Sequence, residues 1–386
     1  MLKYFVEAKS AIRIYSVGIL FSLAFLLIPG VQRHFDSNHV LWLYILLFSY
    51  IIANVTTPAV KFIATRFNVV DKPGGRKIHS NATPLMGGLA VYIAFAVTII
   101  HNDVYSPELK GVAVGATIVF IMGLIDDIKS LPAILKLIVQ LVATYVMIRY
   151  GVVADFLPNV WWGKFFEIVI TMLWVIGITN SLNFFDGMDG LATGLVIVSA
   201  LFMGMLAIQS KQQYLMYLSI ALVGSGLGFL PYNFRYKQCA SIFLGDGGST
   251  FMGFTLASLT IMGGWGATEP IKAYAMPILI LGIFIFDMLY TTATRIKNKQ
   301  ISDFGEWLSF TGKDHMHHRL EKLGFTRKQA VFFILLISAT LGLSALVLRN
   351  GNTLDALLLL LHAVLIYLVI VILMIRRKNK NNAAST

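Results

Sequence analysis

Twelve long apolar stretches are distributed along the 386 residues of this chain. A helix needs about 20 apolar residues to cross the roughly 30 Å hydrocarbon core of a bilayer, where the backbone must satisfy its own hydrogen bonds. Charged residues make up only 13% of the chain, about half the share found in soluble domains. The sequence therefore predicts an all-α integral membrane protein, a polytopic bundle of about 11–12 transmembrane helices. The predicted segments lie near residues 12–29, 40–65, 85–101, 111–125, 133–150, 165–181, 189–209, 213–230, 250–265, 273–294, 329–348 and 354–375.

Lysine and arginine residues are distributed unevenly between the two predicted sides of the membrane. With the N-terminus inside and the segments alternating, 24 of the 31 basic residues fall in inner connections and seven in outer ones. Cytoplasmic loops carry such an excess, so both termini and the inner loops are expected to face the cytoplasm. The same bias accounts for the formal net charge of +12. No nucleic-acid partner is therefore expected.

An acidic pair, Asp126 and Asp127, ends the fourth predicted segment in the sequence GLIDD. Two adjacent carboxylates repel each other, and the C-terminus of a helix disfavours negative charge. A bound cation would relieve both effects. The alternative is a solvated pair of loop acids beside Lys129, which contributes little to stability.

A second acidic group lies in the sequence NSLNFFDGMDG, residues 180–190. Asn183, Asp186 and Asp189 are spaced three apart, so on a helical turn they would share one face. The glycines between and after the aspartates allow a ligand to approach the backbone closely. Because the loop contains no lysine or arginine, its acids have no local basic partner. An unpaired acidic cluster at a membrane surface favours a functional site.

The sequence FLGDGGST, residues 243–250, directly precedes another apolar stretch. Ser249 or Thr250 is expected to cap that helix, and the glycines would expose backbone N–H groups at its positive end. Such a helix start is a phosphate cradle, and Asp246 is placed to hold Mg²⁺ beside it. An ordinary helix cap is the alternative.

Two basic segments lie on the same predicted side. His315, His317, His318 and Arg319 fall in the longest inner loop, where contact with an anion or phosphate is expected. Zinc is the alternative for the histidines, but no cysteine accompanies them. The segment DKPGGRKIH, residues 71–79, offers Lys72 and Lys77 near an inner helix mouth. By itself this segment is typical of a positive-inside loop.

Together these motifs provide carboxylates for a hard cation, glycines for phosphate, and basic residues for excess negative charge. All of them fall on one predicted face of the membrane. Phosphoryl transfer depends mostly on positioning and charge neutralisation, which these groups supply. Mg²⁺ is the expected cofactor, with Mn²⁺ as the alternative.

At these motifs the sequence resembles the polyprenyl-phosphate N-acetylhexosamine-1-phosphate transferases, which include WecA and TagO and, more distantly, MraY. Five motifs run in the order of that family and span residues 71–320. The matching sequences are DKPGGRKIHSNATPLMGG (71–88), GLIDDIKSLPAILKLIVQ (123–140), NSLNFFDGMDGLATG (180–194), FLGDGGSTFMGF (243–254) and DHMHHRL (314–320).

The resemblance implies that a UDP-amino sugar donates its sugar 1-phosphate to undecaprenyl or another polyprenyl phosphate and releases UMP. Asp246 would then ligate Mg²⁺, while Asp126 and Asp127 would serve the lipid-phosphate nucleophile, one of them as a base. The attack would be direct or would pass through a covalent aspartyl intermediate. Three further residues would order the nucleotide and the metal, Asp189 as a second metal ligand: Asn183, Asp186 and Asp189.

The remaining site residues follow from the same resemblance. Phe243 would stack on uracil, and Lys72 and Lys77 would approach phosphates at the cytoplasmic mouth. Contacts with the diphosphate or the sugar would come from His315, His317, His318 and Arg319.

The expected domain organisation has three parts. Residues 1–70 would form N-terminal transmembrane helices, residues 71–328 a catalytic transmembrane core with cytoplasmic motif loops, and residues 329–386 C-terminal helices with a basic cytoplasmic tail. The expected location is the bacterial inner membrane, with the active site facing the cytoplasm, and a homodimer is the assembly left open. The single cysteine, Cys239, excludes an internal disulfide.

Three alternatives remain. The first is phospho-MurNAc-pentapeptide transfer, but the form of the DHMHHRL motif favours the WecA/TagO branch, with N-acetylglucosamine as the sugar. The reaction would then be the first membrane step of a cell-surface glycan pathway. A secondary transporter would place its coupling acids near the bilayer midplane. Asp287 is the acid expected there. Two roles are open for it, a buried structural partner of a cytoplasmic arginine or lysine and a part of the lipid-phosphate path, and the structural role is favoured. A non-catalytic scaffold would leave the acidic glycine loops without a role.

Overall fold

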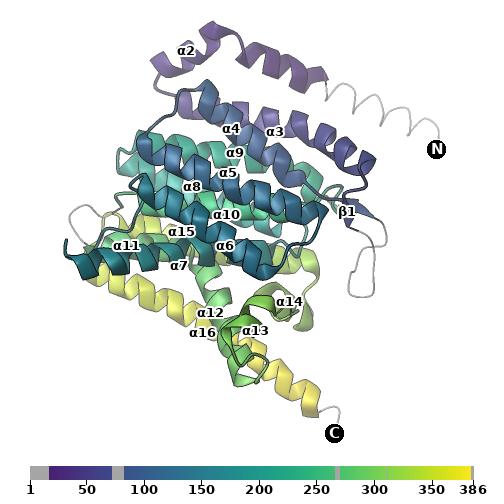
Figure 1. Cartoon of the computed structure of the whole chain (residues 1–386), viewed down its shortest axis with the longest axis vertical. Helices are drawn as coiled ribbons and strands as arrows, with labels where there is room; N and C mark the ends of the chain where they lie inside the picture. The colour runs from purple at the N-terminus through teal and green to yellow at the C-terminus, as the bar shows by residue number, and fades with distance from the viewer. Residues whose placement is uncertain (1–16, 72–81, 266–269, 311, 384–386) are drawn as a thin grey trace.

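The chain folds into a bundle of helices with one two-stranded ribbon at an end, as the computed structural model in Figure 1 shows. The structure describes residues 17–71, 82–265, 270–310 and 312–383. A first described helix spans Val17–Leu26. The other elements are α2 (Pro29–Ser37), α3 (Leu41–Arg66), β1 (Val70–Asp71), β2 (Thr83–Pro84), α4 (Gly87–His101), α5 (Pro107–Ile128), α6 (Ala133–Arg149), α7 (Trp161–Phe185), α8 (Leu191–Gln209), α9 (Gln213–Asn233), α10 (Gly245–Met262), α11 (Pro270–Ile280), α12 (Gly282–Lys297), α13 (Phe304–Ser309), α14 (Met316–Lys322), α15 (Arg327–Leu348) and α16 (Thr353–Ala383).

Each predicted apolar stretch falls on a helix or on a pair of helices. Within the described residues, seven helices are long and apolar enough to cross a membrane, and up to nine if each bent pair is one span. Helices α4 and α6 are shorter than 18 residues, and α10 begins with the polar sequence GDGGST. The prediction of an all-α polytopic membrane protein is confirmed.

Two bent pairs of helices occur where single segments were predicted. The described part of the segment 12–29 holds the helix Val17–Leu26, and α2, which begins at Pro29, continues beyond it at an angle of 69°. The stretch 273–294 divides into α11 and α12, which are bent by 76° at Leu281. Figure 1 shows α12 leaving the bundle toward α13 and α14. The bend therefore carries the histidine motif on a projecting arm.

Helix starts follow local capping chemistry. Ser106 accepts a hydrogen bond from the backbone N–H of Leu109 and precedes Pro107 at the first position of α5. Thr326 and Gln329 form a reciprocal capping box at the start of α15. Such caps satisfy N–H groups that have no partner within the helix. Both helices therefore begin where the sequence provides the cap.

Helix α10 lies at the centre of the bundle and packs against α4, α5, α7, α8 and α9 (Figure 1). Its close approach to α4 depends on glycines. The backbone N–H groups of Gly87 and Gly88 donate to the carbonyl oxygens of Phe243 and Leu244, at 2.9 and 2.7 Å. A Cβ atom on Gly88 would lie 2.1 Å from the Cα atom of Gly248. Small residues allow such contact between helix backbones in membrane bundles.

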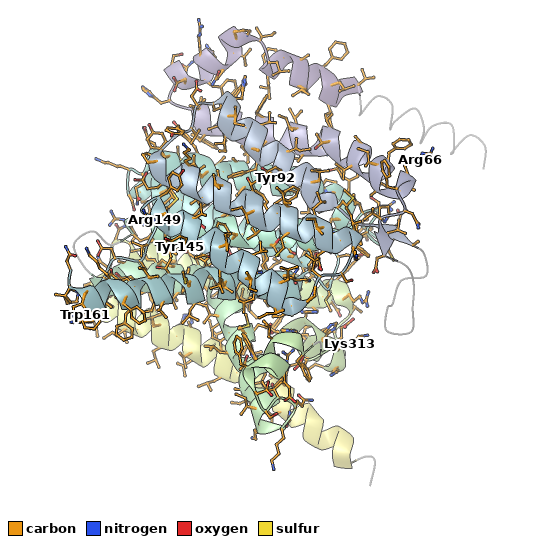
Figure 2. The ribbon with its side chains drawn as sticks, viewed as in Figure 1. Arg66, Tyr92, Tyr145, Arg149, Trp161 and Lys313 are labelled. Carbon is orange, nitrogen blue, oxygen red and sulfur yellow. The ribbon has the colours of Figure 1, made fainter. Side chains whose placement is uncertain are left out.

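The labelled residues mark the two ends of the bundle. Figure 2 shows Arg66 and Lys313 at one end, and Arg149 and Trp161 at the other. This separation agrees with the predicted alternation, in which Arg66 and Lys313 belong to inner connections. The ribbon lies at the Arg66 end, where β1 pairs with β2 in antiparallel register (Figure 1). The backbone N–H of Phe243 then donates to the carbonyl oxygen of Pro84 at 2.9 Å, joining β2 to the segment before α10.

We predict that Gly88→Ala destabilises the protein by about 1–3 kcal/mol, because its methyl group overlaps backbone atoms that cannot rotate away. The measurement is the thermal unfolding of the purified protein in detergent. Gly177→Ala is the matched control, since a Cβ atom on Gly177 in α7 meets no atom within 4 Å. Equal melting temperatures for the two variants would contradict the proposed backbone contact.

Candidate functional site

A cavity of about 560 Å³ opens beside β1 and is lined by aspartates from four segments of the chain. Among the described residues of its wall there is no lysine or arginine. Phe243 and Asn233 also line it. The structure therefore brings together the predicted acidic motifs, which are far apart in the sequence. The aspartates of the wall are Asp71, Asp126, Asp127, Asp186, Asp189 and Asp246.

Lys136 on α6 links two of these aspartates. Its ammonium group forms ion pairs with the carboxylates of Asp126 and, at 3.0 Å, Asp246. Asp126 also accepts a hydrogen bond from the backbone N–H of Leu131 at 2.6 Å. Sequence reasoning did not select Lys136. Its signal was its place one helical turn into α6, ten residues after Asp126, where the turn between α5 and α6 folds it back onto the acidic pair.

The N-terminus of α10 is capped by carboxylates from other helices. Asp127 accepts hydrogen bonds from the N–H groups of Asp246 and Gly247, at 2.8 and 3.2 Å. Asp186 accepts one from the N–H of Gly245 at 3.1 Å. Carboxylates are stabilised at this positive end of a helix. The adjacent acids therefore lie against a partial positive charge as well as beside Lys136.

This capping corrects the prediction that Ser249 or Thr250 caps the helix. Helix α10 begins at Gly245, so both residues lie inside it, and their hydroxyl groups donate to the carbonyl oxygens of Gly245 and Asp246. It also occupies the N–H groups that the predicted phosphate cradle would use, because the first three N–H groups of α10 donate to aspartates. The interhelical caps form only when α5 and α7 pack against α10.

Gly245 is required by the geometry at this point. Its backbone has φ +79°, in the left-handed region that side chains other than glycine rarely adopt. A Cβ atom there would lie 2.6 Å from a carboxylate oxygen of Asp127. The glycine therefore lets the chain turn into α10 directly beneath the carboxylates.

The second predicted motif adjoins the same helix start. The side-chain amide of Asn183 donates to the Asp246 carboxylate at 3.0 Å and to the Ser249 hydroxyl at 2.9 Å. Asp186 follows the last residue of α7, and burial, reinforced by the nearby carboxylates of Asp246 and Asp127, raises its pKa well above its usual range. Asp189 lies in the turn after α7, where its carboxylate accepts a hydrogen bond from the N–H of Ala240 at 2.8 Å.

The histidine motif lies beside the cavity, and its side chains are not part of the described wall. His317 is 1% exposed, and neither of its ring nitrogens has a hydrogen-bond partner among the described residues. Its Nε2 atom faces Gly187 of the Asp186–Asp189 turn, where an added Cβ would lie 2.9 Å away. Burial lowers the pKa of His317 well below its usual range. The ring is therefore neutral near pH 7.

The other members of this motif have protein partners. His318 pairs with Glu321 at 3.3 Å, and burial lowers its pKa. Arg319 donates to the Thr294 hydroxyl at 2.7 Å, and its guanidinium group lies 4.7 Å from the centre of the Tyr290 ring. These contacts hold Arg319 against α12 rather than in the cavity. Lys72 and Lys77, also predicted as binding residues, lie outside the described residues.

The carboxylates suit a hard divalent cation by their chemistry. Among the described residues, no three histidine, cysteine, aspartate or glutamate side chains converge into a ready-made metal site. Mg²⁺ is usually held by one or two carboxylates together with substrate phosphates, and does not require such a cage. Asp246 and Asp189, both in the cavity wall, fit that arrangement.

We predict that His317 makes the fold sensitive to acid. The unfolded chain binds a proton near pH 6.5, whereas the buried ring resists protonation, so protonation favours unfolding. The stability associated with the neutral ring is full above pH 6.5 and declines below it. When the pH is lowered from 7.5 to 5.5, the melting temperature of His317→Gln should therefore fall by less than that of the unmodified protein. His34→Gln, at an exposed position on α2, is the control, and parallel losses in all three proteins would refute the prediction.

Comparison with known proteins identifies the family. Residues 109–264 match the model described as glycosyl transferase family 4. A probable undecaprenyl-phosphate N-acetylglucosaminyl 1-phosphate transferase of Bacillus subtilis is 34% identical over 77% of this chain and 82% of its own length. A decaprenyl-phosphate N-acetylglucosaminephosphotransferase of Mycolicibacterium smegmatis is 31% identical over 74% and 77%, and an undecaprenyl-phosphate alpha-N-acetylglucosaminyl 1-phosphate transferase of Escherichia coli is 29% identical over 72% and 76%. The chain therefore belongs to the polyprenyl-phosphate N-acetylhexosamine-1-phosphate transferases and is a multi-pass membrane enzyme of that family.

Proposed function

We propose that the protein transfers N-acetylglucosamine 1-phosphate from UDP-N-acetylglucosamine to undecaprenyl phosphate and releases UMP, with Mg²⁺ as cofactor. The observation that carries this proposal is the cavity of six aspartates with Lys136 beside it. The names of the similar enzymes support N-acetylglucosamine as the sugar. The proposed location is the bacterial inner membrane, with the cavity facing the cytoplasm.

The predicted excess of lysine and arginine in the inner connections supports this orientation. The cavity adjoins β1, at the end of the bundle where Arg66 and Lys313 lie (Figures 1 and 2). Lysine and arginine mark the cytoplasmic side of a membrane protein. A soluble nucleotide donor and a lipid phosphate can meet only where the site is open to water at headgroup depth. A cavity at this end would be open to the cytoplasm for the nucleotide donor and near the headgroups for the lipid phosphate.

The reaction proposed is a direct displacement. An oxygen of the lipid phosphate attacks the sugar-bearing phosphorus of the donor, forming one P–O bond, while the bond from that phosphorus to the bridging oxygen breaks and UMP leaves. Direct attack is favoured over a covalent aspartyl intermediate because both oxygens of Asp127 accept N–H groups and Asp126 is bound by Lys136 and Leu131. Because their oxygens already accept hydrogen bonds or an ion pair, these acids are better suited to orienting neighbouring groups than to attacking the donor as nucleophiles.

Other side chains in or beside the cavity would neutralise the charge of the substrates and hold them in place. Lys136 offers a cation between the two acidic motifs, where a lipid phosphate would otherwise be repelled. Asp246 and Asp189 would hold Mg²⁺, which when bound neutralises charge on the diphosphate. Phe243 lines the cavity and presents an aromatic ring for the uracil base. His317 and Asp186 adjoin the same turn, where the diphosphate and sugar would lie.

The function is tested by measuring UMP release from purified protein supplied with Mg²⁺, undecaprenyl phosphate and UDP-N-acetylglucosamine. UDP-MurNAc-pentapeptide is assayed in parallel. Release with the first donor alone supports the proposal. Release with the second donor alone would place the enzyme with the phospho-MurNAc-pentapeptide transferases. Silence with both would leave another UDP-sugar as the next donor to assay.

We predict that Asp246→Asn lowers transferase activity at least 100-fold, the scale on which loss of one charge-stabilising group acts. The amide keeps the size of the side chain and an acceptor for Asn183 but loses the charge that binds Mg²⁺ and Lys136. UMP release is measured over a range of Mg²⁺ concentrations. Asp36→Asn, at an exposed site on α2, is the control, and normal Mg²⁺-dependent turnover of Asp246→Asn would exclude this residue as the metal ligand.

We also predict that Lys136→Gln lowers kcat by about 100-fold, because the carboxylates of Asp126 and Asp246 then face each other without the intervening cation. Lys129→Gln is the matched control, since Lys129 is exposed in the connection between α5 and α6, seven residues before Lys136. Both variants are assayed for UMP release after their melting temperatures are compared. Similar activity in the two would show that the bridging ammonium group has no part in the reaction.

A further inference from the structure

A buried acid outside the cavity, Asp287, is placed to organise the histidine motif. It lies in α12 and is 1% exposed. Its carboxylate accepts two short hydrogen bonds, from His315 Nδ1 and from the backbone N–H of Met316, both at 2.6 Å. The expectation that Asp287 pairs with an arginine or lysine is therefore wrong. A buried carboxylate is stabilised by such paired donors, and Asp287 is not among the residues that line the cavity.

His315 is engaged on both sides of its ring. Arg295 Nη2 lies 3.4 Å from His315 Nε2, and an arginine can only donate. Nε2 therefore accepts in this pair, which leaves the ring proton on Nδ1, directed at Asp287. Arg295 is itself held by Asp314, through two hydrogen bonds of 2.8 and 2.9 Å. Asp287, His315, Arg295 and the half-buried Asp314 thus form a continuous network, named here the α12–α14 network.

The α12–α14 network fixes the start of α14. His315 is the residue before the helix, and the N–H of Met316 that Asp287 binds is the first amide of the helix. The ring of His315 also stacks on Phe184 near the end of α7, with the ring centres 4.6 Å apart. Three helices therefore meet at His315. Two residues further on, His317 lies against Gly187 beside the cavity.

We infer that Asp287 and His315 are positioning residues, which set the orientation of α14 and thereby place His317 beside the cavity. His315 was predicted to contact the diphosphate or sugar, but both of its ring nitrogens are used within the protein. The inference rests on the proposed function, because the histidine placed in this way is the one assigned to the substrate side of the cavity.

The substitution Asp287→Asn tests the network with little change in volume. His315 Nδ1 and the Met316 N–H bind different oxygens of Asp287, Oδ2 and Oδ1, whereas an asparagine in the same place keeps an oxygen at only one of these two positions. If its NH₂ group instead donates to His315 Nδ1, the ring proton moves to Nε2 and meets the donor of Arg295. Each arrangement loses one hydrogen bond at the start of α14. The variant therefore loosens α14 without removing any group from the cavity.

Two measurements on the full-length protein in detergent decide the inference. The first is amide hydrogen exchange over residues 314–322, read by mass spectrometry. The second is the kcat and KM of UMP release. The variants are Asp287→Asn, His315→Ala, their combination, and His315→Asn, whose side-chain NH₂ can still donate to Asp287. Asp303→Asn is the control, because Asp303 caps the neighbouring helix α13 with a carboxylate at an exposed position.

We expect Asp287→Asn and His315→Ala each to raise exchange in residues 314–322 at least tenfold. We expect kcat to fall about 10- to 100-fold, as for other carboxylates that orient a histidine, with the KM for undecaprenyl phosphate unchanged. The kcat of the double variant should be no lower than that of the less active single variant, because both substitutions break the same network. His315→Asn should recover part of the activity that His315→Ala loses, and Asp303→Asn should leave kcat unchanged.

Unchanged exchange in both single variants would overturn the inference, as would losses of kcat that multiply in the double variant. Multiplying losses would mean that His315 contacts substrate by itself. If the unmodified protein releases no UMP from any UDP-sugar, the proposed function fails, while the exchange measurement still decides whether Asp287 and His315 hold α14. If Asp287→Asn does not fold, the two His315 variants carry the same comparison.

Discussion

Carboxylates gathered at the end of a membrane bundle have to be stabilised by positive charge or by hydrogen-bond donors, and the N-terminus of α10 supplies the donors here. Its first three N–H groups bind Asp127 and Asp186. Without these donors and Lys136, the acids of α5, α7 and α10 would repel one another in a partly desolvated cavity. The packing of the whole bundle serves to bring these helix ends together.

Glycine at the centre of the bundle makes that arrangement possible. Gly88 and Gly248 let α4 and α10 approach at backbone distance, and Gly123 brings α5 equally close to the start of α10. The helices can then deliver their terminal residues into one small volume. A side chain at any of these positions would separate the carboxylates from the amides that they bind. Close helix packing and the electrostatics of the cavity are therefore consequences of the same small residues.

The projecting arm formed by α12, α13 and α14 carries the histidine motif. The histidine and arginine side chains of the 314–320 motif lie beside the acidic cavity and are not part of its described wall. The bend at Leu281 carries α12 away from the bundle, and Asp287 and Arg295 on α12 occupy the polar groups of His315 and Asp314. Of the three histidines in the motif, His317 is the one whose ring nitrogens have no partner among the described residues, and it lies next to Gly187. The arm separates the residues that support the motif from the residue that faces the cavity side.

Much of the site was predictable from local sequence. Apolar length predicted the membrane helices, and the acid–glycine motifs predicted Asp126, Asp127, Asp186, Asp189 and Asp246, which the structure places around one cavity. These are properties of short segments: a helix long enough to span lipid, or an acid without a nearby base, can be recognised without its neighbours. The motif order also led to the family that the comparisons establish.

Partner choice was decided only by tertiary structure. Nothing near Lys136 in the sequence indicates that it bridges Asp126 and Asp246, since 110 residues separate it from the latter. Likewise, the partner of Asp287 proved to be a histidine 28 positions away, and the caps of α10 came from α5 and α7 rather than from its own serine and threonine. Local sequence determined which helices form and which end of the bundle is acidic. The packing of those helices decided which donor each carboxylate binds, because hydrogen bonds and ion pairs depend on distances through space that only the assembled bundle sets.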